Sequence, residues 1–264
     1  MEQVIFLLFF IILGLCWGSF LNVIAYRITF DKPFFTPRSQ CPSCHKIIPF
    51  YDNIPVISWI LLKRRCRQCK ATISWIYPFI EALTGFLISM LALFIFGYSF
   101  NSHTLPIFTA YFIFFSALII ATATDFYAMV IPQMVTTWLI PVGLGLAFFS
   151  YIKISLVESI IGTIMGYGIL WLTGWLFKRT TQQDGIGEGD MELLAMIGSF
   201  LGIKGVWCSL MCGSIFGLIG GGTYLVFVGK HNRTPIPFGP FLSLGALLSF
   251  FFEHYLSLYL LGGY

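Results

Sequence analysis

Charged residues are scarce in this chain of 264 residues: Asp, Glu, Lys and Arg make up only 10%, against roughly 25% in an ordinary soluble domain. So few charges cannot cover a water-facing surface of normal size, which excludes a soluble globular enzyme. Disorder is excluded too, because 58% of the residues are hydrophobic and 18% are aromatic. We therefore expect an integral membrane protein, embedded in the lipid bilayer.

The basic residues do not form the continuous stripe that nucleic-acid binding requires. The formal net charge is +4, but Lys and Arg fall in the gaps between apolar runs. We expect no nucleic-acid partner.

Long charge-free stretches are what the sequence has instead. A spanning helix needs about 20 apolar residues, and residues 82–124 contain no formal charge, with one polar break at 101–104. The sequence therefore predicts an all-α polytopic membrane protein with about eight transmembrane helices, over residues 3–26, the two parts of 82–124, 132–152, 156–177, 193–203, 205–229 and 239–261.

The basic residues also indicate the orientation, because short loops rich in Lys and Arg stay in the cytoplasm. With an even number of spans both termini lie on one side. If that side is outside, all basic residues except Lys153 and Lys204 lie in the cytoplasm. We expect both termini outside.

Four cysteines lie in the one long polar segment, as two Cys-x-x-Cys pairs separated by 21 residues: Cys41, Cys44, Cys66 and Cys69. Four thiolates at this spacing favour a structural zinc ion. Two disulfides are the alternative, although they are rare in a reducing cytoplasm. The sequence thus divides into a first transmembrane helix (1–26), a cytoplasmic zinc-binding module (27–78) and a membrane domain (79–264).

Two aspartates interrupt the apolar runs near one membrane face. Asp125 directly follows the third predicted span, where the helix dipole disfavours an anion. Asp190 ends the loop Gly185-Ile186-Gly187-Glu188-Gly189 and precedes an apolar run, so a helix N-cap is its structural alternative. Because carboxylates at such places are costly, and two of them can share a proton and activate a water, we expect an aspartic catalytic pair.

The motifs around these residues resemble the bacterial prepilin peptidases, or type IV leader peptidases, over nearly the whole chain. The resemblance is carried by Asp125 before Ile131-Pro132, Gly187-x-Gly189-Asp190, Gly18-Ser19-Phe20-Leu21-Asn22-Val23 with Tyr26-Arg27, Tyr51-Asp52-Asn53-Ile54-Pro55, Tyr77-Pro78 with Glu81, and Pro237-Phe238-Gly239-Pro240. It implies a membrane aspartyl protease of the bacterial inner membrane with Asp125 and Asp190 as its catalytic pair. It also implies that the four-cysteine segment accompanies an N-methyltransferase that takes its methyl group from S-adenosylmethionine.

The implied substrates are prepilins and pseudopilins, whose basic leader precedes an apolar helix. That leader stays in the cytoplasm while the helix enters the bilayer, so the scissile bond lies at the inner interface. We expect the acidic loop to bind the leader through Asp184, Glu188 and Glu192, with Gly187 and Gly189 allowing a close peptide approach; an ordinary solvated loop is the alternative. The alternative functions are a leader peptidase without methyltransferase activity and a zinc-regulated transporter. The sequence predicts neither the S-adenosylmethionine-binding residues nor the oligomeric state.

Overall fold

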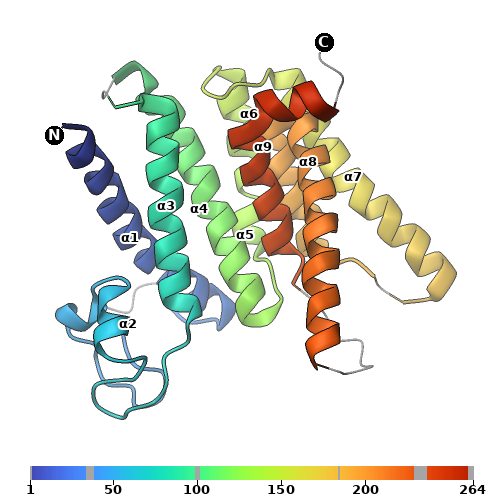
Figure 1. Ribbon diagram of the computed structural model, residues 1–264. Helices are drawn as coiled ribbons and strands as arrows, with labels where there is room; N and C mark the ends of the chain where they lie inside the picture. The colour runs from blue at the N-terminus through green and yellow to red at the C-terminus, as the bar shows by residue number, and fades with distance from the viewer. Residues whose placement is uncertain (1, 34–38, 99–101, 184, 229–236, 261–264) are drawn as a thin grey trace. The chain divides into compact units, whose positions relative to one another are not determined.

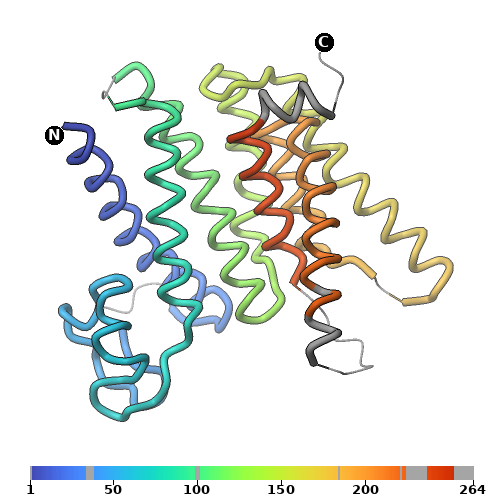
Figure 2. Tube along the Cα trace, in the orientation of Figure 1, coloured from blue at the N-terminus to red at the C-terminus, as the bar shows by residue number. Residues whose placement is uncertain are grey.

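The computed structural model describes residues 2–33, 39–98, 102–183, 185–228 and 237–260 (Figures 1 and 2). Helices joined by turns and loops make up this part of the chain, and it contains no strand. The chain forms two compact units, residues 1–123 and 124–264. The longer helices are α1 (Glu2–Thr29), α3 (Ile76–Phe96), α4 (Leu105–Ala128), α6 (Leu139–Phe148), α7 (Leu156–Thr181), α8 (Glu188–Val228) and α9 (Gly239–Leu260). The shorter ones are α2 (Ile57–Leu61) and α5 (Gln133–Thr136), with 3₁₀ turns over Phe50–Asn53 and Ser102–Thr104.

The first unit packs α1 against α3 and the first part of α4. The helices approach closely at Gly14, where a Cβ atom would meet the backbone of Gly85. Nearer the amino-terminal end of α1, the rings of Phe10, Phe96 and Phe108 pack with centroids 5.0 to 6.0 Å apart. Helices packed in a membrane typically have small residues where their backbones touch and apolar side chains in the remaining space.

The second unit is built on α7, α8 and α9. Glycines again allow the closest contact, because a Cβ atom at Gly162 of α7 would collide with the carbonyl of Gly198 on α8. Ser159 donates a hydrogen bond from its hydroxyl to the carbonyl of Ser199 at 2.6 Å, which ties the same two helices. A mid-helix break in α8 falls at Gly202, whose φ of +66° suits glycine.

Most of the apolar stretches predicted from the sequence lie in helices within the described residues, but the predicted span 132–152 forms two short helices, α5 and α6, and is not helical after Phe148. Five helical segments there are long and apolar enough to cross a membrane, and residues 133–148 and 239–252 form shorter apolar helices. The predicted separate spans 193–203 and 205–229 are two parts of α8, and the division lies at Gly202 instead of Lys204. Large apolar side chains remain exposed along α1 and α7, including Ile12 and Ile164. This is a multi-pass membrane protein, since such faces suit lipid.

Candidate active site

Asp125 lies in the last turn of α4 and is only 5% exposed. The helix ends at Ala128, and the next residue, Met129, donates its N–H to the Asp125 carbonyl at 2.9 Å and has a φ of +54°. The chain then runs through Ile131 and Pro132 into α5. A carboxylate is thus held beside a sharp change of chain direction.

Asp190 lies in the first turn of α8 and is partly buried. The residue before it, Gly189, packs so tightly on Ile131 that an added Cβ would lie 2.9 Å from the Ile131 Cβ. The segment after Asp125 therefore touches the residue before Asp190. Within residues 124–264, the fold brings together the two aspartates that the sequence singled out.

A third chain segment completes this region. Gly239, the first residue of α9, donates its backbone N–H to Oδ2 of Asp125 at 2.9 Å. A Cβ at Gly239 would lie 2.9 Å from both that oxygen and the Ile131 Cδ1, so a larger residue does not fit. In the sequence, Gly239 and Pro240 are marked only by a family resemblance. The signal for a role was a glycine placed directly before Pro240 at the start of an apolar helix.

This arrangement has the parts needed for acid and base chemistry. Two carboxylates near each other do not both ionise readily, so they can share one proton. The N–H of Gly239 fixes one oxygen of Asp125, which orients the carboxylate. The pair can therefore deprotonate a water on one side and donate a proton on the other.

The residues predicted to bind a basic leader are placed in different ways. Glu188 is exposed at the start of α8, and the Gly187 Cβ position has only ordinary contact, 3.5 Å from the Asp190 Oδ2. The Glu192 carboxylate is instead bonded to α5, as described below. Asp184 lies outside the described residues.

The four cysteines of the polar segment come together in the first unit. Their sulfur atoms all lie within 4.8 Å of one another, and the Cys41 and Cys69 sulfurs are 3.8 Å apart. A tetrahedral zinc ion with Zn–S bonds of about 2.3 Å requires sulfurs about 3.8 Å apart. The donor set and spacing thus fit zinc, with Cys44 and Cys66 as the other two ligands.

Both cysteine pairs adopt the same tight turn. In the first, the Cys41 N–H donates to the Lys46 carbonyl at 3.0 Å and the His45 N–H donates to the Cys41 carbonyl at 2.8 Å. Cys66 and Lys70 repeat these two bonds at 2.8 and 3.1 Å. His45 and Lys70 have φ values of +56° and +60°. His45 thus occupies a turn position, and the sulfur cluster is formed by the four cysteines alone.

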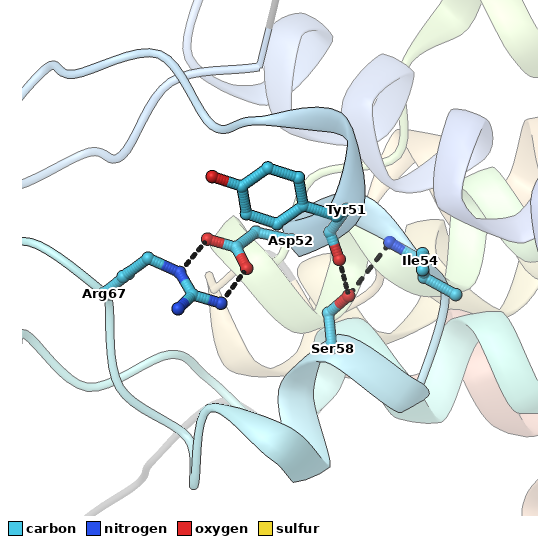
Figure 3. A network of polar contacts seen from close by, with 5 residues as sticks. All are labelled: Tyr51, Asp52, Ile54, Ser58 and Arg67. Carbon is cyan, nitrogen blue, oxygen red and sulfur yellow. Dashed lines mark hydrogen bonds and ion pairs between the residues drawn. The ribbon is translucent and has the colours of Figure 1, made fainter.

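A polar network supports the chain between the two cysteine pairs (Figure 3). Arg67 donates two hydrogen bonds to the Asp52 carboxylate, at 2.8 Å from Nε and 2.6 Å from Nη2, and lies over the ring of Tyr51. The hydrogen bond from Arg67 holds the pKa of Asp52 below its usual value. The Ser58 hydroxyl donates to the Tyr51 carbonyl at 3.0 Å and accepts from the Ile54 N–H at 2.9 Å. Residue 67 belongs to the second cysteine pair, so this network links that pair to the intervening turn.

A buried carboxylate joins this module to the helices of its own unit. Glu81 of α3 accepts a hydrogen bond from the Val56 N–H at 2.7 Å. Val56 has φ +61° and ψ −49°, a conformation that a β-branched residue rarely adopts. Nearby, Asn22 of α1 donates from Nδ2 to the Tyr77 carbonyl at 3.0 Å. Asn22, Tyr77 and Glu81 belong to motifs that stand out in the sequence, but their spacing along the chain does not reveal these contacts.

Comparison with known proteins gave consistent results along the chain. Residues 12–95 match the bacterial peptidase A24 N-terminal domain, and residues 112–222 match the type IV leader peptidase family. A prepilin leader peptidase/N-methyltransferase of Stutzerimonas stutzeri is 32% identical over 262 residues, covering 90% of this chain and 88% of the relative. The protein of the same name from Burkholderia pseudomallei strain 1026b is 33% identical over 276 residues, covering 93% and 85%. No solved structure gives a significant match.

Proposed function

The chain belongs to the type IV leader peptidase family, and we propose that Asp125 and Asp190 are the aspartic pair with which it cleaves the leader from prepilins and pseudopilins. The observation that carries the assignment is their convergence: Gly239 holds the Asp125 carboxylate, and Ile131 and Gly189 bring the flanking segments together. The peptidase activity itself follows from the family. A second activity, N-methylation of the new amino terminus, follows from the relatives that are named prepilin leader peptidase/N-methyltransferase.

The proposed cleavage uses one carboxylate as base and the other as acid. The ionised carboxylate takes a proton from water as the water oxygen attacks the scissile carbonyl carbon. The protonated carboxylate donates a hydrogen bond to the carbonyl oxygen and stabilises the charge that develops there. As the tetrahedral intermediate collapses, the C–N bond breaks and the leaving amine receives a proton from the pair. The Gly239 N–H keeps Oδ2 of Asp125 in place throughout.

The four cysteines of the module are proposed to hold structural zinc. A closed four-thiolate site leaves no position for a water, so zinc stabilises the module and takes no part in cleavage. S-adenosylmethionine, when bound, supplies the methyl group for the second activity. We assign residues 27–78 to the methyltransferase-associated module and 79–264 to the peptidase domain, after a first transmembrane helix at 1–26.

The proposed topology places the active site at the cytoplasmic face of the inner membrane, with both termini outside. The excess of Lys and Arg in the loops on the cytoplasmic side supports this topology. It also places a basic leader on the same side as the acidic residues at the start of α8. Glu188 and Asp184 are proposed to attract the leader. Exposed charge pairs contribute only about 0 to 1 kcal/mol each, so this recognition depends on several charges and weakens with salt.

Purified full-length enzyme, incubated with a prepilin and S-adenosylmethionine, provides the test. Mass spectrometry is expected to show loss of the leader and a gain of one methyl group on the new terminus. Asp125→Asn and Asp190→Asn should each abolish leader loss while the folded protein is retained, because an amide cannot carry the shared proton. Substantial cleavage by either variant would refute the aspartic mechanism. Cleavage without methylation would favour the alternative of a leader peptidase alone.

A further inference from the structure

Glu192 lies two residues after Asp190 on α8, and both of its carboxylate oxygens are bonded to α5. Oε1 accepts a hydrogen bond from Gln133 Nε2 at 3.0 Å, and Oε2 accepts one from Thr136 Oγ1 at 2.9 Å. Thr136 is fully buried, whereas Gln133 is exposed. One bond therefore lies at the surface, and the other reaches a buried hydroxyl.

The Thr136 hydroxyl has a choice of acceptors. Its oxygen also lies 3.4 Å from the Pro132 carbonyl, but a hydroxyl has one proton to donate. The carboxylate oxygen is closer, at 2.9 Å, so it is the better placed acceptor. Thr136 thus carries a bond between helices in place of a bond within its own short helix.

The position of these bonds matters because of what α5 is connected to. Between Asp125 and Gln133 the chain passes through the left-handed residue Met129 and the Ile131 that Gly189 touches. α5 has only four residues, too few to hold its own place. The Glu192 bonds therefore fix the segment that follows one aspartate against the helix that begins with the other.

We propose that Glu192 is a positioning residue for the aspartic pair, which it aligns by tying Thr136 and Gln133 to the first turns of α8. This inference rests on the proposed catalytic role of Asp125 and Asp190. It replaces the expectation that Glu192 binds the basic leader, because its two oxygens are already engaged by α5. Glu188 and Asp184 remain the candidates for leader binding.

The first test compares Glu192→Ala and Thr136→Val with the matched control Thr137→Val. Thr137 is the exposed neighbour of Thr136 on the same turn. Because displacement of a reacting group by about 1 Å can cost about a hundredfold in rate, Glu192→Ala and Thr136→Val should lower kcat about tenfold to a hundredfold, with KM changed less than about threefold. Thr137→Val should behave as the wild type. The substrates are one prepilin with a Lys-containing leader and the same prepilin with those Lys residues replaced by Gln.

A leader-binding residue would behave differently in the same assay. Removal of such a residue would raise KM for the prepilin with the Lys-containing leader and leave KM for the prepilin with the neutral leader unchanged. That result, or an unchanged kcat in folded Glu192→Ala, would overturn the proposal. Glu192→Ala should cost less in the Thr136→Val background than in the wild type, since the Thr136 bond is already absent there and only the exposed Gln133 bond remains to be lost.

The second test exchanges the charge between the partners and does not depend on removing a side chain. Gln133→Glu alone places two carboxylates together and should lower kcat. Combined with Glu192→Gln, it lets the new amide donate to Glu at 133 and accept from Thr136, so kcat should return to within about threefold of wild type. Failure of this rescue, with thermal unfolding showing both proteins folded, would also overturn the proposal.

The two proposals fail separately. If Asp125→Asn and Asp190→Asn remain active, the aspartic mechanism is wrong. If those two variants are inactive while Glu192→Ala and Thr136→Val cleave like the wild type, only the positioning role is wrong.

Discussion

Gly239 donates its backbone N–H to the carboxylate of Asp125, a residue 114 positions earlier in the chain. The donor belongs to the first turn of α9, where N–H groups have no partner inside the helix. The bond therefore satisfies a helix end and orients a buried carboxylate at the same time. The donor on α9 is a backbone N–H, so the bond depends on the position of the backbone at residue 239 and not on a side chain.

Gly239→Ala is expected to lower kcat for leader cleavage about tenfold to a hundredfold, because the added methyl group would displace the Asp125 carboxylate or α9. Steady-state cleavage of a purified prepilin measures it. Gly168→Ala is the control, because a Cβ there meets no atom within 4 Å. Equal rates for both variants and wild type would contradict a steric requirement at residue 239.

The two glycines before Asp190 should differ in sensitivity. An added Cβ at Gly189 lies 2.9 Å from the Ile131 Cβ, whereas at Gly187 it meets only the Asp190 Oδ2 at an ordinary 3.5 Å. Gly189→Ala should therefore cause the larger loss of cleavage and lower the thermal unfolding temperature, since overpacking costs about 1 to 3 kcal/mol. Cleavage rates and unfolding curves of the two variants provide the comparison. A larger loss at Gly187 would indicate that substrate contact, not packing, governs this loop.

Elemental analysis of the purified protein should find about one zinc ion per chain. Replacement of Cys66 and Cys69 by Ser should remove it. Loss of zinc should expose the segment around Asp52 to limited proteolysis, because metal binding supplies much of the folding free energy of so small a module. If cleavage in the metal-free variant were lost while zinc readdition restored it without refolding the module, zinc would have a catalytic role.

Glu81→Ala should loosen the cysteine module from α3. The change leaves the Val56 N–H without its acceptor, at a cost of about 1 to 3 kcal/mol, and the unusual backbone at Val56 loses its support. We expect faster proteolysis between the two cysteine pairs. Glu81→Gln should be protected, because an amide oxygen can accept the same bond. Identical proteolysis of Glu81→Ala and wild type would show that the module is held by other contacts.

The sequence was sufficient for the features that depend on composition and local spacing. Apolar runs identified the membrane helices, and the two Cys-x-x-Cys pairs identified the sulfur cluster. The charge of Lys204 predicts a boundary between two spans there, whereas the structure has the break at Gly202, where the left-handed φ favours glycine. A charged residue is easily recognised in a sequence, but the break lies at the glycine whose backbone can adopt the non-helical conformation.

Contacts between distant segments could not be predicted from one sequence. The sequence shows the acidic side chain of Glu192 but not its partners on α5, so it predicts a place in the acidic loop. Thr136 lies in a mostly apolar run beside Gln133 and Thr137, and a polar residue there has many possible partners. The bond from Gly239 cannot be predicted for a further reason. Its donor is a backbone N–H, which every residue except proline has, so the residue type does not indicate the bond.

The repeated turn of the two cysteine pairs has a consequence for how the module assembles. Each turn is closed by hydrogen bonds between residues four or five positions apart, and such short loops close in well under a microsecond, about 10 to 100 ns for ten residues. The slower step is the meeting of the two turns, which closes the 21-residue connection between Cys44 and Cys66. The cost of closing a flexible loop grows only with the logarithm of its length. Extra residues inserted in that connection, away from Asp52, Val56 and the short helix α2, should therefore be tolerated far better than a single residue inserted within either turn.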